Sequence, residues 1–339
     1  MNGKNGLLLW QPDRFLMEGN GITGKERVWK TIRFEGTDRL AMFAGRNADI
    51  AFVATDPPKG FVPAEPGMDE WGAVWKSFHP ELGDQGQVVS FPLQDCETFD
   101  HYRFPDPGAE GRFDRMAEKI AKIDPDQLIL GDLGLGAIHR LESLLGFEEY
   151  MMLLLLEPEK IEQLLDGIFG WLEGLAVRYA ECGADGVIFF DDQAIQTGPL
   201  FSMDLWRELF APRYTHFFRL VHEKGMAVFM HTCGNIQYHL PELIKCGADV
   251  IDNKQPEAWL FSPQAQEARG KVTFSTCIDI QQRMQHLSLD QIPAEVDRLI
   301  RAAATPEGGM IGTCYGKSDM EIDPEANARM LEAMEAFRW

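Results

Sequence analysis

Residues 181–190 read ECGADGVIFF, and residues 245–252 repeat the pattern as KCGADVID. In each stretch a Cys-Gly pair, typical of a helix C-terminus, precedes Ala-Asp and a short apolar run. The glycine ends the helix because it readily adopts the left-handed conformation that other residues avoid. The apolar run has the length and composition of a buried strand. Both stretches therefore predict one unit, a helix followed by a strand of a parallel sheet.

The same unit recurs along the chain. Strands are predicted at residues 40–44, 128–131, 186–190, 227–230, 249–252, 272–275 and 310–313. Helices are predicted at residues 23–34, 159–181, 205–224, 240–246, 293–304 and 324–337. So many units without an obvious linker favour a closed (β/α)8 TIM barrel of the α/β class over a doubly wound sheet. The eighth strand is expected near residues 51–54 or within the segment that follows them.

The expected organisation is a single barrel domain over residues 23–339, preceded by an N-terminal extension at residues 1–22. Thr23 and Glu26 form a capping-box pattern at the first helix. Residues 55–107 are rich in Pro, Gly and Trp and predict an irregular excursion, with a small hairpin that pairs residues 71–76 with 87–91. Long irregular segments of this kind often act as lids or walls of a site.

Composition excludes several classes of protein. The formal net charge of −21 and the lack of a basic patch argue against nucleic-acid binding. No run approaches the roughly 18–20 apolar residues of a membrane span, and residues 7–10 are too few for a signal peptide. The six cysteines lack the spacing of a disulfide framework. We therefore expect a cytoplasmic protein with free thiols.

Residues 226–234, MAVFMHTCG, place an imidazole and a thiol at the end of a predicted strand. In an alternating α/β protein, active sites form at the carboxyl ends of the strands. Cys314 follows the strand at 310–313 in the same way. Two cysteines and one histidine are three ligands of a zinc site with an open fourth position, which is the catalytic arrangement. His231, Cys233 and Cys314 are thus predicted to bind Zn²⁺.

Other interpretations compete at each of these positions. His231 alone could be a hydrogen-bonded core histidine, and Cys233 a buried thiol. Cys277 competes with Cys314 as the second thiolate, but the glycine-rich turn around Cys314 leaves more room to place a ligand. Glu257 could occupy the fourth zinc position until substrate displaces it, or it could be a solvated loop residue.

Asp191 and Asp192 follow the strand at 186–190 and are predicted catalytic residues. One of them would act as a general acid or base, or hold the substrate. The simpler alternative is that one caps the next helix, and the sequence does not choose between the two. The predicted substrate-binding residues, which all follow strands, are Arg46, Asp279 and Tyr315.

With these residues in place, the sequence resembles the uroporphyrinogen decarboxylase superfamily, and within it the corrinoid-dependent methyltransferases. The matching segments are 69–75 (DEWGAVW), 183–192 (GADGVIFFDD), 198–200 (GPL), 212–214 (PRY), 231–235 (HTCGN) and 324–327 (PEAN), together with Cys314. Members of this superfamily are (β/α)8 barrels. In the methyltransferase branch a His-x-Cys pair and a distant Cys hold zinc, and these match His231, Cys233 and Cys314; Glu257 falls where some relatives place a further ligand.

The resemblance implies a zinc-dependent methyltransferase that moves a methyl group between a corrinoid (cobalamin) on a partner protein and a small-molecule thiol or methylated substrate. The decarboxylases themselves carry Arg-Gln-Ala-Gly-Arg after the first strand, whereas residues 42–46 here read MFAGR. A decarboxylase is therefore the less favoured alternative. Two further alternatives are a zinc hydrolase and an inactive accessory subunit. The chain could also form a homodimer.

Overall fold

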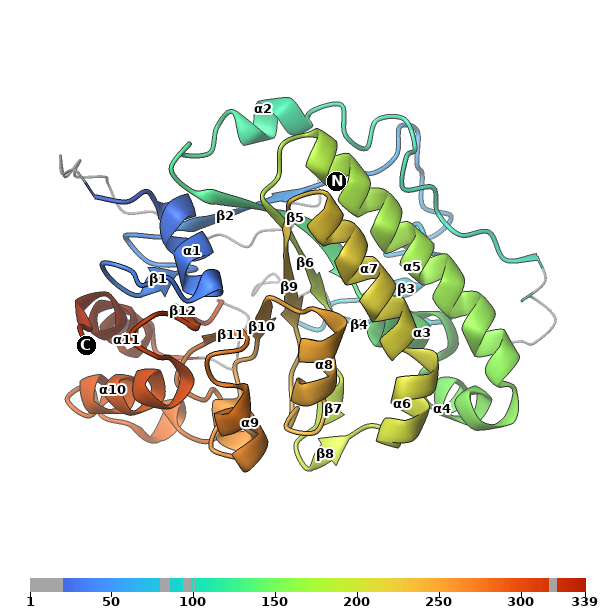
Figure 1. Ribbon diagram of the computed structural model, residues 1–339. Helices are drawn as coiled ribbons and strands as arrows, with labels where there is room; N and C mark the ends of the chain where they lie inside the picture. Colours follow the sequence, from blue (N-terminus) through green and yellow to red (C-terminus); the bar gives the residue numbers. More distant parts are fainter. Residues whose placement is uncertain (1–20, 80–85, 94–98, 100, 317–321) are drawn as a thin grey trace.

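A computed structural model of the protein describes residues 21–79, 86–93, 99, 101–316 and 322–339. The predicted extension at residues 1–22 lies outside the described residues except for its last two. Eight parallel strands form one curled sheet in the order β1-β12-β11-β10-β9-β6-β5-β2 (Figure 1). They are β1 (Ala41–Met42), β2 (Ile50–Ala54), β5 (Leu128–Leu135), β6 (Gly186–Phe190), β9 (Ala227–His231), β10 (Val250–Asp252), β11 (Thr273–Thr276) and β12 (Met310–Gly312).

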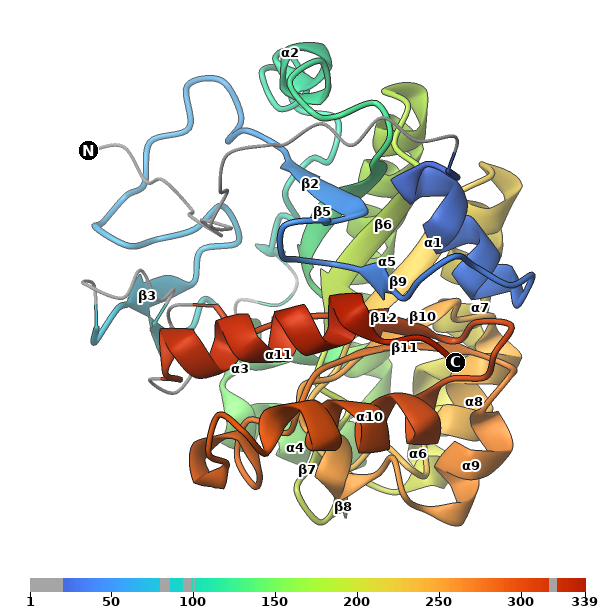
Figure 2. The same cartoon turned by 90° about the vertical axis from the view of Figure 1, so that its left-hand side faces the viewer.

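Helices surround the outside of the curled sheet, as the two perpendicular views in Figures 1 and 2 show. They are α1 (Gly24–Arg33), α2 (Met116–Ile120), α3 (Ala137–Leu145), α4 (Phe147–Leu156), α5 (Pro158–Glu181), α6 (Met203–Leu209), α7 (Ala211–Glu223), α8 (Leu240–Cys246), α9 (Pro263–Ala268), α10 (Ile292–Ala303) and α11 (Pro324–Ala336). Thr23 and Glu26 form the predicted capping box of α1. Among the described residues, no helix is both long and apolar enough to cross a membrane.

The two end strands of the sheet meet and complete the barrel. The main-chain N–H of Asp49, just before β2, donates to the carbonyl of Met42 in β1 at 2.8 Å. The rings of Phe43 and Phe52 pack with centroids 4.8 Å apart inside the barrel. The predicted (β/α)8 barrel is thereby confirmed, and β2 is the eighth strand expected near residues 51–54.

A buried ionic network holds this seam. The Asp49 carboxylate accepts hydrogen bonds from Arg27 at 2.6 Å and from both terminal nitrogens of Arg39 at 2.8 Å. It also accepts the main-chain N–H of Met42 at 2.8 Å. A buried carboxylate needs such partners because burial removes its hydration. The network ties α1 and the end of β1 to the start of β2.

The predicted hairpin of the excursion is confirmed as β3 (Val74–Lys76) paired antiparallel with β4 (Gln87–Ser90). The acidic residues just before it anchor the excursion to the barrel. Asp69 pairs with Arg140 of α3 at 3.3 Å, and Glu70 pairs with the buried Arg112 at 2.5 Å. These contacts give the segment 69–75 a structural role.

Two features of the helices differ from prediction. The single helix expected at residues 205–224 is two helices, α6 and α7, which meet at Phe210. Pro212 stands in the first turn of α7, where its missing N–H costs nothing, but its ring would clash with a helix continuing from α6. Helix α4 was not predicted, because its apolar run at 151–156 shows no helical periodicity. The short helices α2, α3 and α9 were not predicted either.

Candidate metal centre

Three neighbouring strands bring polar residues to the carboxyl end of the barrel. Phe190, the last residue of β6, is in register with His231, the last residue of β9. His231 is in turn in register with Asp252, the last residue of β10. Asp191 and Asp192 directly follow β6. The parallel sheet therefore places an imidazole and several carboxylates side by side.

His231 is oriented by a carboxylate. Its Nδ1 is 2.5 Å from Oδ2 of Asp252, whose Oδ1 accepts a hydrogen bond from Ser275 at 2.6 Å. Burial raises the pKa of a carboxyl group, yet the bonds from His231 and Ser275 hold the pKa of Asp252 below its ordinary value. Burial conversely lowers the pKa of His231, but the bonds to Asp252 and Cys233 raise it well above its ordinary value. This pairing leaves Nε2 of His231 facing the site.

The Cys233 thiol lies beside that nitrogen, with Sγ 3.4 Å from Nε2 of His231. Burial raises the pKa of Cys233, and the neighbouring His231 partly offsets the effect. Gly234 has a positive φ of 79°, and a Cβ there would lie 2.2 Å from the carbonyl oxygen of Ala194. Only glycine permits this turn, which brings Cys233 back toward the end of β9.

Asp192 completes a group around these two residues. Its Oδ1 accepts the main-chain N–H of Cys233 at 2.6 Å, and its Oδ2 lies 3.5 Å from Nε2 of His139. Burial raises the pKa of Asp192, but the bond to His139 and the charges nearby hold it below its ordinary value. Across the described parts of the chain, Asp192, His231 and Cys233 are the one group of His, Cys, Asp or Glu whose ligand atoms all lie within 4.8 Å of one another.

These donors fit a zinc ion. Zinc binds an imidazole nitrogen at about 2.1 Å and a thiolate at about 2.3 Å, so two such ligands of a tetrahedral ion stand about 3.6 Å apart. The 3.4 Å between Nε2 of His231 and Sγ of Cys233 matches this separation. A ligating histidine also typically donates its other ring N–H to a carboxylate, as His231 does to Asp252.

Asp191 is placed differently from its neighbour. Fully buried, its carboxylate accepts the main-chain N–H groups of Ala137, Ile138 and His139 at 2.8–3.2 Å, and the hydroxyl of Tyr214. These N–H groups open α3 and have no partner within the helix. Gly136 makes the approach possible, since a Cβ there would lie 2.5 Å from atoms of Asp191. Asp191 thus caps α3, and Asp192 faces the site.

Two residues of the site were missed by sequence reasoning. Asp252 ends the strand next to the one that ends in His231, so the adjacency of the strand ends is the signal that could have found it. His139 lies in the first turn of α3, where Nδ1 is 3.2 Å from the carbonyl oxygen of Phe190. Burial lowers the pKa of His139, but the Asp192 carboxylate beside it outweighs that effect and raises the pKa to about 9. Its only sequence signal is its place after the glycine-rich segment 131–136.

Cys314 lies outside the group of three ligands. It is half-buried after β12 and packs against the hydrophobic core. Burial raises the pKa of the fully buried Cys277 and outweighs the lowering effects of Lys254 and the Tyr315 hydroxyl. The charge on Cys314 also raises the pKa of Cys277. The predicted substrate-binding residue Tyr315 is itself buried, at 4% exposure.

The remaining predicted residues are also apart from the group. Glu257 forms an ion pair with Arg298 of α10. Asp279 is buried and accepts main-chain N–H groups from Glu257, Gln281 and Gln282 at 2.7–3.0 Å. Arg46 is exposed in the loop after β1.

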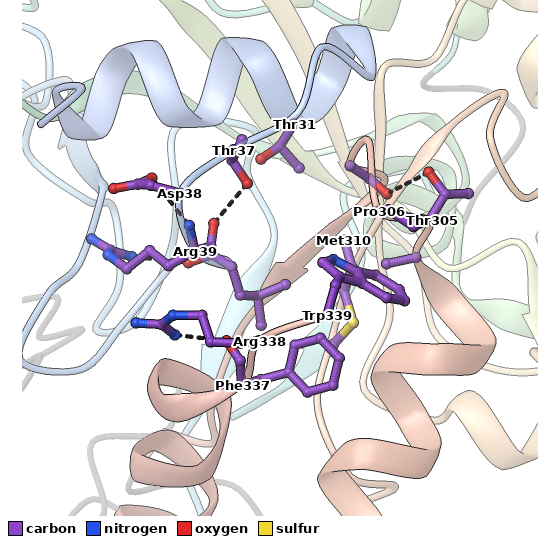
Figure 3. A pocket seen from close by; sticks show the side chains of 13 residues that line it. Thr31, Thr37, Asp38, Arg39, Thr305, Pro306, Met310, Phe337, Arg338 and Trp339 are labelled. Carbon is purple, nitrogen blue, oxygen red and sulfur yellow. Dashed lines mark hydrogen bonds between the residues drawn. The ribbon is translucent and has the colours of Figure 1, made fainter.

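A cavity of about 250 Å³ lies at the opposite end of the barrel (Figure 3). Its walls come from the segments before β1 and β12, with Arg39 and Met310, and from the C-terminal residues Phe337 and Trp339. In α/β barrels the catalytic groups gather at the carboxyl ends of the strands. This cavity therefore plays no part in the candidate site.

A family model and one solved structure agree with this architecture. The family model described as uroporphyrinogen decarboxylase (URO-D) matches residues 82–337. Among solved structures, a methyltransferase from Methanosarcina mazei superposes with a TM-score of 0.67 at 17% identity, over 92% of this chain and 98% of that one. An endo-β-1,4-xylanase from Gloeophyllum trabeum gives a TM-score of 0.41 at 12% identity, over 69% and 84%. A comparison with curated protein sequences finds no match.

Proposed function

The chain belongs to the uroporphyrinogen decarboxylase family, and from the chemistry at its barrel mouth we propose that it is a zinc-dependent methyltransferase. It would move a methyl group between a corrinoid on a partner protein and a small-molecule thiol or methylated substrate. The observation that carries this proposal is the 3.4 Å between Nε2 of His231 and Sγ of Cys233, with Asp252 on the other ring nitrogen. The five cysteines that the structure describes form no disulfide with one another, which fits a protein of the reducing cytoplasm.

Each residue has a distinct task in this proposal. His231 and Cys233 hold the metal, and Asp252 fixes the imidazole ring so that Nε2 points toward it. Zinc, when bound, lowers the pKa of a coordinated thiol, or acts as a Lewis acid toward an ether oxygen. Asp191 supports the site indirectly, because it fixes the start of α3 and hence the position of His139.

The end of β1 supports transfer over decarboxylation. A tetrapyrrole decarboxylase is expected to present cationic and amide side chains there, to bind the substrate carboxylates. Met42 and Phe43 occupy these positions and are buried, with Phe43 packed on Phe52 and Phe229 inside the barrel. The apolar residues at this point provide no carboxylate-binding group.

The test begins with protein purified without added metal. We expect about one zinc per chain by mass spectrometry and consumption of methylcobalamin only when a thiol is also present. A chelator should abolish both, and zinc should restore both. The same assay is run in the reverse sense, with a methyl ether and cob(I)alamin. A zinc-loaded protein inactive in both directions, or a protein that binds no zinc after reconstitution, would overturn the proposal.

Asp252→Asn is expected to weaken zinc binding about 10–100-fold. Without its carboxylate partner, a ligating histidine is less basic and its ring is no longer held in one orientation. Competition with a chelating dye measures the affinity. Asp249→Asn is the matched control, since Asp249 flanks the other end of β10 and pairs with His222 at 2.8 Å, remote from the site. Equal zinc affinities for the two variants would show that Asp252 does not tune His231.

A further inference from the structure

The inward-facing residues of β5 end in a carboxylate. Leu128 and Leu130 belong to the apolar cluster inside the barrel, and side chains alternate along a strand, so Asp132 also faces inward. It is in register with Ile188 of β6, another member of that cluster. On β9, the next strand, His231 lies one inward-facing position nearer the carboxyl end. Asp132 is therefore on the inner wall of the barrel, slightly deeper than the metal centre and separated from it by one strand.

Asp132 has no cationic partner among the described residues. Its Oδ1 accepts the main-chain N–H of Gly134 at 2.8 Å, whereas no described residue donates a hydrogen bond or brings a positive charge to Oδ2. Burial therefore raises the pKa of Asp132 above its ordinary value, offset only by the bond from Gly134. By contrast, Asp252 of the metal centre pairs with His231. A carboxylate left without a counter-charge in a barrel interior is costly, and such groups gather at functional sites.

The surroundings of Asp132 are aromatic and accessible to solvent. Its side chain is only partly buried, and Ala54, its partner in register on β2, is exposed. The strands on either side each carry an inward-facing phenylalanine that is also partly exposed, Phe52 of β2 and Phe190 of β6. Phe190 in turn packs against His231, with ring centroids 5.3 Å apart. Aromatic faces and a carboxylate both attract cations, so this wall suits a positively charged ligand.

We infer that Asp132 binds a cationic group of the substrate, so that the small thiol or methylated compound carries an ammonium group. The inference rests on the proposed function and narrows its substrate class. The reacting end of the substrate lies at the metal held by His231 and Cys233, and the cationic end lies deeper, at Asp132. Phe190, on the strand between them, lines this path. An anionic substrate of the same size is disfavoured, because the like charge of Asp132 repels it.

Choline and its neutral carbon analogue, 3,3-dimethylbutan-1-ol, test the recognition of charge by isothermal titration calorimetry of the purified protein. We expect choline to bind at least about tenfold more tightly, the usual gain from a contact with a charged group. Asp132→Asn keeps the shape of the side chain but removes its charge, so it should lose most of this preference. Asp126→Asn is the matched control, because the exposed Asp126 precedes the opposite end of β5, and it should keep the wild-type preference.

Methyl transfer connects this wall to the metal centre. With methylcobalamin as donor, the acceptors are 2-aminoethanethiol, 2-mercaptoethanol and 3-mercaptopropionate, which end in an ammonium, a hydroxyl and a carboxylate. We expect kcat/KM to be highest for the ammonium thiol and lowest for the carboxylate. The acidities of the thiols are the same for both proteins, so the ratio of wild type to Asp132→Asn isolates the effect of the charge.

The outcomes separate this inference from the proposed function. Wild-type protein that binds choline no better than its neutral analogue would overturn the inference, as would a folded Asp132→Asn variant with the full preference. Either result leaves zinc-dependent transfer standing. A choline preference in protein that binds no zinc and transfers no methyl group would overturn the proposed function and leave a cation site. If Asp132→Asn fails to fold, a wild-type kcat/KM that is highest for the carboxylate thiol still contradicts the inference.

Discussion

Cys233→Ala is expected to lower kcat/KM for methyl transfer by at least about 10³-fold, a loss of about 4 kcal/mol in transition-state stabilisation. Its Sγ lies 3.4 Å from Nε2 of His231, and these are the two donors whose separation fits one zinc ion. Without the thiol, stoichiometric zinc should also be lost. Steady-state kinetics with methylcobalamin and a thiol, together with metal analysis, measure both effects.

Cys182→Ala is the control for Cys233→Ala. Cys182 is half-buried at the end of α5 and belongs to no part of the site. Its replacement should change kcat/KM by less than about twofold, as is usual for substitutions remote from a functional site. If Cys233→Ala kept full zinc and at least a tenth of the wild-type activity, the assigned ligand pair would be wrong.

Asp191→Ala is expected to lower the free energy of unfolding by about 3–5 kcal/mol, the usual cost of breaking a buried charged network. The substitution leaves three N–H groups at the start of α3, two of them buried, and the hydroxyl of Tyr214 without their acceptor. Urea unfolding of the metal-free protein, followed by circular dichroism, measures the change.

Asp192→Ala is the matched control for Asp191→Ala, because it removes the adjacent carboxylate from the same loop. The Asp192 side chain is 31% exposed and water can replace its partners. Measured without metal, its replacement should cost less than about 1 kcal/mol. Similar losses in the two variants would contradict the different roles that we assign to the two aspartates.

Local patterns predicted most of the barrel. Glycine-capped helices followed by short apolar strands, as at residues 181–190 and 245–252, indicate parallel pairing because only that arrangement buries strands on both faces. The uncertain eighth strand, β2, was ambiguous because it carries both buried and partly exposed residues. The break between α6 and α7 was missed although Pro212 marked it.

The pairing of His231 with Cys233 could be predicted because both follow one strand, at a spacing that the chain itself sets. The rest of the site depends on which strands are neighbours. Asp252 and Asp192 reach His231 only because β10 and β6 flank β9 in the sheet.

The sequence by itself determined the α/β class, the order of its elements and the residues able to carry zinc chemistry, because these follow from local periodicity and side-chain type. Only the tertiary structure decided that Asp191 caps α3 while Asp192 faces Cys233. Consecutive residues after a strand point to different sides, and what lies on each side is set by elements distant in the chain. Strand adjacency is therefore the information that turns candidate ligands into a site.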